Sequence, residues 1–464
     1  GALFGTIGAE GVVSNLTSAG EISGGLGGPK GTTKLGHVGG FVGRLYGKLV
    51  NVTNTGKVKG IATYNAGVAG FVQQGAVLDG VKNYGEITSS AAYVAGVAAY
   101  VYEDAEFNKC VNYGNISSSV AAGYAAGIAA TALPSKFVEC VNEGQISSGS
   151  SAGIVANCSG KSGGLIYTFD RCQNNGEVTG NGILGGITAV QGATAGNNVC
   201  HYIQCVNNGD ITATATQAVS SSAMAGIAAF YSPGSVFEYC INTGFVTNTK
   251  SVYTAGIAAN NKGSATADYP VVFKGCVNTG NIASSAQQIA GIVAYITNYT
   301  SVDSCLNYGT IEQGIWGAAG ICYTMAGTTS SLTNCINYGD VSVTQYNAGG
   351  IVGNCASTTA VIENCVNVGN ITSTTTAEKN NYGVGGIAGS SYATMKNCFN
   401  AGKVVGKLRV GGIVGSPSYY AKVARTQLVN CVNVGLITAD EGCGGALVGT
   451  TKGEEEKYWG DNNS

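Results

Sequence analysis

Residues 110–116 read Cys-Val-Asn-Tyr-Gly-Asn-Ile, and residues 140–146 repeat the pattern as Cys-Val-Asn-Glu-Gly-Gln-Ile. A small-small-apolar run, Ala126-Gly127-Ile128, lies between these two stretches. Related copies of this unit recur about fourteen times along the chain, at a period of 29 to 36 residues. A repeat of this length predicts a solenoid, because one unit cannot bury its apolar face alone and needs neighbours stacked on it.

The cysteine position of the unit is a small apolar slot. Another apolar residue stands three positions before it in most copies, and Ile or Val stands six positions after it in all fourteen. Polar residues flank these positions, which predicts short strands whose side chains alternate between inside and outside. A glycine four positions after the slot indicates a tight corner with positive φ. The slot residues are Leu16, Val52, Val81, Cys110, Cys140, Cys172, Cys205, Cys240, Cys276, Cys305, Cys335, Cys365, Cys398 and Cys431.

An asparagine follows the slot by two positions in thirteen of the fourteen copies, from Asn54 to Asn433, and Ser18 takes its place in the first. In a parallel β-helix, equivalent residues lie above one another at a strand spacing of ~4.8 Å. We therefore expect a column of amides that donate and accept along the axis and also hold the corner backbone. This pattern favours a structural role over a ligand site.

Small residues mark a third short strand in each unit, as at Ala66-Gly67-Val68, so three strands and three corners predict a triangular coil. We predict an all-β fold, a right-handed parallel β-helix (β-solenoid) of about 14 coils of about 30 residues each, roughly 70 Å long. Residues 1–453 form its single domain, and residues 454–464 form an acidic, polar C-terminal tail.

The chain opens in mid-coil, because residues 1–5 (Gly-Ala-Leu-Phe-Gly) match residues 445–449 (Gly-Ala-Leu-Val-Gly). We expect it to be truncated from a longer protein whose targeting segment lies upstream.

Three stretches carry a family resemblance: Gly-Gly-Phe-Val-Gly at residues 39–43 and Gly-Gly-Ile-Val-Gly at residues 349–353 and 411–415. With the Asn-x-Gly corner that follows each of them, they resemble the GLUG-motif repeats of large bacterial surface and secreted proteins. The resemblance spans essentially residues 1–450. It implies a cell-surface or secreted, adhesin-like repeat protein, and it implies neither an enzymatic activity nor a defined ligand.

Composition restricts the partners. Only 10% of the residues are charged, the formal net charge is −2, and Ser, Thr and Asn fill the positions expected to be exposed. Nucleic-acid binding needs a basic stripe that neutralises several phosphates, and this chain has none, so we expect no nucleic-acid partner. No apolar stretch approaches the ~18 residues of a membrane span, so we expect no membrane insertion by this segment.

Eleven of the sixteen cysteines occupy the slot that Leu and Val fill in the first three copies, so the position requires a small hydrophobe, which free cysteine is. Stacked cysteines have parallel Cβ atoms, which disfavours a relaxed disulfide, and a linear column does not converge on a metal ion. We predict free buried thiols, no metal and no cofactor. Any one of the remaining cysteines could pair: Cys158, Cys200, Cys322, Cys355 and Cys443.

Candidate ligand-binding residues lie where the repeat is interrupted. Long insertions before the slot carry Lys161, Asn197, His201 and Lys262, polar types suited to recognition. Tyrosines three positions before the small-residue glycine occupy successive copies and predict an exposed aromatic stripe. Such a stripe binds sugar rings, or it stabilises an outer wall by stacking across coils, and both readings stay open. The tyrosines of the stripe are Tyr64, Tyr93 and Tyr124.

Catalysis by a β-helix, as in polysaccharide lyases and hydrolases, needs paired carboxylates or an acidic metal site. The one tight acidic group is Glu103, Asp104 and Glu106, which reads as a solvated loop, and His37 and His201 are the sole histidines. We assign no catalytic residue.

The sequence thus predicts a non-enzymatic, adhesin-like module located outside the cell or at its surface, with a glycan or a host or extracellular protein as partner. The first alternative is a structural stalk of a larger surface protein. The second is a polysaccharide-active β-helix enzyme.

Overall fold

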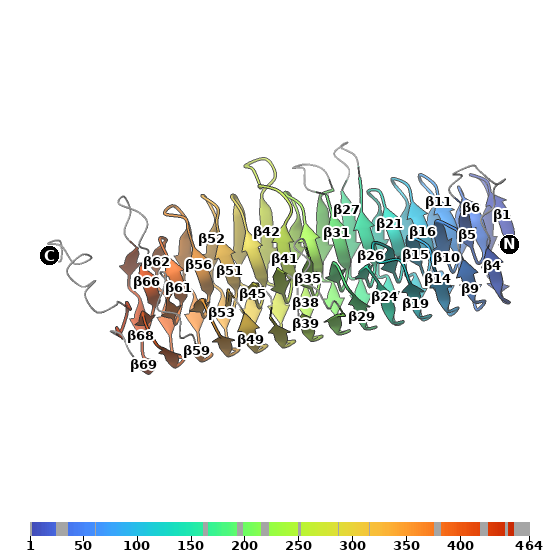
Figure 1. The fold of residues 1–464 in the computed structure, drawn as a ribbon. Helices are drawn as coiled ribbons and strands as arrows, with labels where there is room; N and C mark the ends of the chain where they lie inside the picture. Colours follow the sequence, from blue (N-terminus) through green and yellow to red (C-terminus); the bar gives the residue numbers. More distant parts are fainter. Residues whose placement is uncertain are drawn as a thin grey trace.

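The computed structural model describes residues 2–24, 36–60, 62–160, 166–192, 198–214, 222–248, 252–285, 287–314, 316–374, 382–417, 426–440 and 444–449. All regular elements in these ranges are β-strands, and every strand pairing is parallel. The coils stack into an elongated rod whose two ends hold the first and the last strands (Figure 1). The predicted all-β parallel β-helix is confirmed.

Each coil contains five short strands instead of the three that we predicted. The chain turns at two further places, directly before the slot and at the small-residue glycine, and these turns divide segments that the sequence pattern presents as continuous. The expectation of a three-stranded triangular coil is therefore wrong. One coil consists of β17 (Glu106–Asn108), β18 (Val111–Asn112), β19 (Ile116–Ser118), β20 (Tyr124–Ala126) and β21 (Ala129–Ala132).

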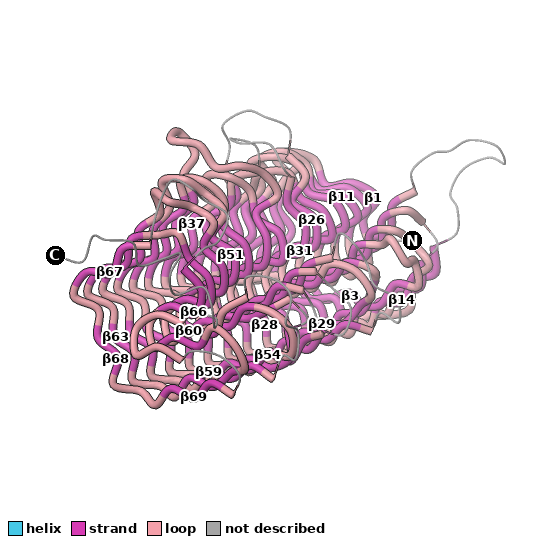
Figure 2. Tube along the Cα trace, turned by 60° about the vertical axis from the view of Figure 1, so that its left-hand side comes forward, coloured by secondary structure: helices cyan, strands magenta, loops and turns pink. Residues whose placement is uncertain are grey.

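Equivalent strands of successive coils form five sheets that run along the rod (Figure 2). Four of the sheets have 14 strands each, and the sheet that begins with β5 (His37–Gly39) has 13. Repeated residues pair with their counterparts, for example Asn112 with Asn142. In chain order, the first sheet runs from β2 (Val12–Ser14) to β67 (Gln427–Val429), the second from β3 (Thr17–Ser18) to β68 (Val432–Asn433), the third from β4 (Ile22–Gly24) to β69 (Ile437–Ala439), the fourth from β5 (His37–Gly39) to β65 (Val410–Gly411), and the fifth from β1 (Phe4–Ile7) to β66 (Val414–Pro417).

The residue directly before the slot adopts the left-handed backbone conformation in every coil. Asparagine and glycine tolerate this conformation best, yet Lys109 (φ 51°), Glu139 (φ 53°) and Arg171 (φ 49°) also adopt it. This corner separates the first sheet from the second. The complete set is Asn15, Asn51, Gly80, Lys109, Glu139, Arg171, Gln204, Tyr239, Gly275, Ser304, Asn334, Asn364, Asn397 and Asn430.

We predicted that the glycine four positions after the slot is required for a positive φ, but the structure gives another reason. Of these glycines, only Gly20 has a positive φ (106°). A Cβ on Gly114 would overlap the carbonyl oxygen of Gly85 in the preceding coil, at a separation that real Cβ atoms do not adopt. The position is therefore glycine because the backbones of adjacent corners approach closely, and the expectation of positive φ is wrong.

Aromatic rings fill the interior beside the first sheet. The rings of Phe107 and Phe137 stack with centroids 4.9 Å apart, and those of Phe237 and Phe273 stack 4.6 Å apart. Burial of each such side chain stabilises the fold by roughly 1.5–3 kcal/mol. One hydrophobic cluster extends from Ile7 to Val414. The described coils therefore share a continuous core.

The predicted asparagine column is present. In twelve successive steps from Asn54 to Asn433, each Nδ2 donates to the Oδ1 of the next asparagine, as from Asn112 to Asn142 at 2.8 Å. The same Nδ2 donates to the carbonyl oxygen of the corner glycine, as from Asn112 to Gly114 at 2.8 Å. This column, called the asparagine ladder below, satisfies buried groups that would otherwise lack partners.

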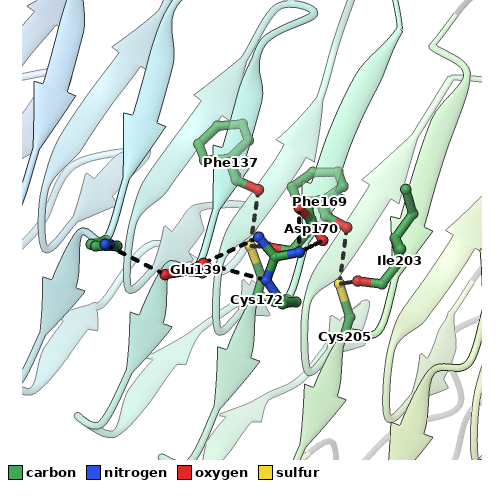
Figure 3. Close-up of polar contacts among 9 residues, drawn as sticks. Phe137, Glu139, Phe169, Asp170, Cys172, Ile203 and Cys205 are labelled. Atoms are coloured by element: carbon green, nitrogen blue, oxygen red, sulfur yellow. Dashed lines mark hydrogen bonds and ion pairs between the residues drawn. The ribbon is translucent and has the colours of Figure 1, made fainter.

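The slot cysteines form a second buried column. The Sγ of Cys172 donates to the carbonyl oxygen of Phe137, and that of Cys205 to Phe169, each at 3.2 Å (Figure 3). All fifteen cysteines in the described ranges are free thiols, as we predicted for the slot column. Four of them lie outside the slot, and Cys443 lies outside the described ranges. Burial raises the pKa of Cys172 well above its ordinary value, which keeps the thiol neutral.

Candidate ligand-binding surface

The three tyrosines predicted to form a stripe do stack. They begin β10 (Tyr64–Ala66), β15 (Tyr93–Ala95) and β20, and they are register partners in the fourth sheet. The ring centroids of Tyr64 and Tyr93 lie 4.7 Å apart at an interplanar angle of 19°, and those of Tyr93 and Tyr124 lie 5.5 Å apart at 21°. The rings therefore stack along the rod axis.

The prediction of an exposed stripe is wrong for Tyr64, which retains 8% of its accessible surface. Its ring contacts Phe71 (centroids 5.1 Å apart) and Tyr100 (5.5 Å) of the fifth sheet. In β16 (Ala98–Val101), the two central residues both point away from the main core, which brings Tyr100 over Tyr64. Burial, followed by smaller contributions from Tyr93, Tyr100 and Tyr102, raises the pKa of Tyr64 to about 12.

The rings around Tyr64 form one packed group, which we call the aromatic cluster. Phe71 and Tyr100 stack at 5.4 Å, and the ring of His37 meets Phe71 edge-on at 4.7 Å. The guanidinium carbon of Arg44 lies 5.9 Å from the centroid of Phe71. Since these residues cover one another across coils, the aromatic cluster favours the interpretation that the tyrosines stabilise the outer wall. Tyr93 and Tyr124 stay partly exposed.

The remaining predicted residues do not join this cluster. His201 lies in β32 (Cys200–Ile203) of the first sheet, three coils beyond Tyr124, and burial lowers its pKa. Lys262 follows a strand that ends at Asn261, and the chain then forms a loop before β42 (Val271–Lys274) that projects from one edge of the rod (Figure 1). The Nζ of Lys262 lies 4.1 Å from the ring centroid of Phe230. Lys161 and Asn197 lie outside the described residues.

Sequence reasoning missed a more open set of tyrosines, three positions after the slot at the outer side of the second sheet. The rings of Tyr84 and Tyr113 stack with centroids 4.5 Å apart at 10°, and 49% and 41% of their surfaces are exposed. Tyr308 and Tyr338 stack 4.7 Å apart at 4°, with 48% and 41% exposed. The signal that could have revealed them is the tripeptide Asn-Tyr-Gly at the corner position of two pairs of adjacent copies, at residues 83–85, 112–114, 307–309 and 337–339.

Polar residues occupy the same column between the two tyrosine pairs. Asn175 Nδ2 donates to Glu143 Oε1 at 2.9 Å, and Asn208 Nδ2 donates to Asn175 Oδ1 at 2.8 Å. Thr243 Oγ1 donates to Asn208 Oδ1 at 2.8 Å. Thr279 follows in the column, and its Oγ1 donates to the backbone carbonyl oxygen of Asn242 at 3.4 Å. We call the whole row from Tyr84 to Tyr338 the tyrosine–amide column. Glu143 is its one charged member.

An aliphatic stripe lies beside this column, one position after the slot. The slot and asparagine side chains of these strands point inward, so the residues between them point outward. They are partly exposed, and Gln173 interrupts the series. From the coil of Tyr113 to that of Tyr338, the stripe consists of Val111, Val141, Val206, Ile241, Val277, Leu306 and Ile336.

Carboxylates on the first-sheet side pair with cations of adjacent coils. Glu139 lies between Lys109 (3.9 Å) and Arg171 (3.1 Å), and Arg171 also pairs with Asp170 at 2.9 Å (Figure 3). These pairs are exposed, so each contributes little to stability.

The acidic loop that we singled out is likewise engaged with neighbouring coils. Glu106 pairs with Lys136 at 3.3 Å, and Asp104 accepts a hydrogen bond from Gln74 at 3.5 Å. In the described ranges, no group of three or more His, Cys, Asp or Glu side chains is placed to hold a metal ion. The same ranges contain no helix long and apolar enough to cross a membrane.

Comparisons with models of known protein families, with curated proteins and with solved structures return no match. The fold and this surface geometry therefore carry the functional argument.

Proposed function

We propose that this chain is a non-enzymatic, adhesin-like module, secreted or displayed at the cell surface, that binds a glycan or an extracellular protein along its outer wall. The observation that carries the proposal is the pairing of exposed tyrosines at a wall position that other coils fill with Asn, Thr, Glu, Val or Ala. A stacked wall does not require these rings, because Asn208 and Thr243 occupy the same column.

The chemistry of the wall suits recognition. Tyrosine presents a large, rigid surface with few side-chain torsions to order, together with a hydroxyl group. The surrounding amides and hydroxyls supply donors and acceptors without a strong electric field. The loop at Lys262 and the partly exposed Tyr93 and Tyr124 offer further contact points of the same kind.

The test is a binding screen of the intact rod against a glycan array and a panel of extracellular matrix proteins. We expect saturable binding to at least one of them, reduced by alanine at the exposed tyrosines. A rod that binds nothing in either screen contradicts the proposal and supports the stalk alternative. Release of reducing sugar from a bound polysaccharide would instead support the enzyme alternative.

A further inference from the structure

We propose that the tyrosine–amide column binds one extended chain of a neutral polysaccharide, laid along the rod axis so that it contacts both tyrosine pairs at once. This inference rests on the proposed function and names the ligand class and the surface. It assigns a role to Tyr84, Tyr113, Tyr308 and Tyr338, none of which the stacking of coils requires.

The two tyrosine pairs have the same local construction. In each, a threonine precedes the first tyrosine in the column: Thr55 before Tyr84, and Thr279 before Tyr308. The rings of a pair cover each other, so one face of the first ring is turned toward the small, exposed threonine. The ring planes stand across the rod axis, so a polymer laid along the axis crosses the exposed edges of both pairs, with its hydroxyl groups near the threonine oxygen.

The pairs lie in one line at a fixed separation. The strands preceding Tyr84 and Tyr308 are β13 (Lys82–Asn83) and β48 (Leu306–Asn307), which are seven steps apart in the second sheet. Seven strand spacings correspond to about 34 Å. Because the asparagine ladder and the shared core connect all intervening coils, the rod keeps the two pairs in register. A ligand that reaches both must be an extended polymer.

The surface between the pairs indicates an uncharged polymer. Asn175, Asn208 and Thr243 present amide and hydroxyl groups, and each amide nitrogen has a second hydrogen beyond the one used within the column. Glu143 is the single charge within the column, and it already accepts from Asn175. A polyanion gains nothing from this column, whereas hydroxyl groups find partners and the aliphatic stripe covers the C–H faces of the sugars.

Because the two tyrosine pairs lie on one rigid rod, this binding mode predicts that affinity depends on the length of the oligosaccharide. An oligosaccharide too short to span about 34 Å binds either pair singly, whereas a longer one binds the second pair at high effective concentration. The probe is a length series of neutral β-linked glucan oligosaccharides, from disaccharide to polymer, with a linear mannan series in parallel. Binding is measured by titration calorimetry on the whole chain.

We expect affinity to rise at least about tenfold once the oligosaccharide spans both pairs. The double variants Y84A/Y113A and Y308A/Y338A should each abolish that rise while leaving weak binding of short oligosaccharides to the intact pair. Tyr46→Ala, which removes a ring that is 39% exposed at another corner, is the matched control and should change nothing. Thermal unfolding of all variants confirms that the rod stays folded.

The outcomes separate this inference from the proposed function. If a neutral polymer binds but both double variants keep the length-dependent rise, the column is not the site, and glycan binding itself stands. If the rod binds a protein in the screen but neither oligosaccharide series, the ligand class is wrong. If sedimentation shows self-association that the tyrosine variants abolish, the face is an interface between copies of this chain, which overturns the inference.

Discussion

The Oδ1 of Asn112 occupies the space that a Cβ on Gly96 would need, closer than the 3.0 Å that real Cβ atoms keep. The same relationship joins Gly127 to Asn142 in the next coil. The small-residue motif and the slot-x-Asn motif, far apart in each repeat, are therefore the two sides of one contact. Glycine is needed at the first motif because the asparagine ladder runs against it.

Replacing Gly96 by alanine should destabilise the rod by roughly 1–3 kcal/mol, since the added methyl group must displace a hydrogen-bonded amide and the backbone carbonyl oxygen of Gly127. Gly5→Ala is the matched control, because a Cβ there meets nothing within 4 Å. The measurement is the denaturant midpoint of each variant. Equal midpoints for the two variants would contradict the contact.

Removing one amide from the asparagine ladder should cost about 1 to 3 kcal/mol, because its neighbours lose buried partners. Asn207 accepts from Asn174 and donates to Asn242, each at 2.8 Å, so Asn207→Ala breaks two links. Asn433 ends the described ladder and is only partly buried, so Asn433→Ala should cost less. Chemical unfolding of both variants provides the comparison. Negligible losses at both sites would mean that the ladder contributes nothing to stability.

The slot cysteines should resist a thiol reagent in the folded protein and react after denaturation without reductant, because the column faces the core. Cys431, which is partly exposed, should react first. Mass spectrometry of the labelled protein counts the modified sites. Ten or more oxidised half-cystines in the native protein would rule out the free-thiol column.

Tyr64→Ala should lower stability by about 3 kcal/mol, because it removes a buried ring that contacts Phe71, Tyr93 and Tyr100. Tyr124→Ala should cost less, since that ring is partly exposed and ends the stack. Thermal unfolding compares the two variants. If both leave the melting temperature unchanged, the aromatic cluster does not stabilise the wall and its ligand-binding reading gains support.

Alkaline pH offers an independent check of the burial of Tyr64. Its pKa is raised from 10.0 to about 12, so the folded state keeps the proton more tightly than the unfolded state. Its contribution to stability is complete below pH 10 and is lost as the pH rises toward 12. Ultraviolet titration of the wild type against Tyr64→Phe should show one late-ionising tyrosine. A difference titration centred near pH 10 would contradict the packing.

The fold could be predicted because its determinants repeat in every coil: the slot, the asparagine and the six-position Ile or Val. The left-handed corner escaped prediction because six of its fourteen residues, among them Lys109, Glu139 and Arg171, are types that do not favour positive φ, although the other eight are Asn or Gly. The burial of Tyr64 depends on Tyr100, which belongs to another strand and another sheet. No local pattern contains that contact.

The candidate site was predictable only in part for a different reason. We searched for ligand-binding residues where the repeat is interrupted, and Tyr84 and Tyr113 lie inside a fully regular corner. Their position holds Asn, Thr, Glu, Val or Ala in other copies, so a variable outward position lies between the repeated asparagine and the repeated glycine.

The central claim is that the outer wall of the second sheet recognises a ligand. The most direct test compares the wild type with the variant Y84A/Y113A/Y308A/Y338A on one glycan array, with equal amounts of folded protein. We predict that the wild type binds neutral polysaccharides and that the variant, with an unchanged melting temperature, does not. Equal binding by the two proteins would contradict the claim.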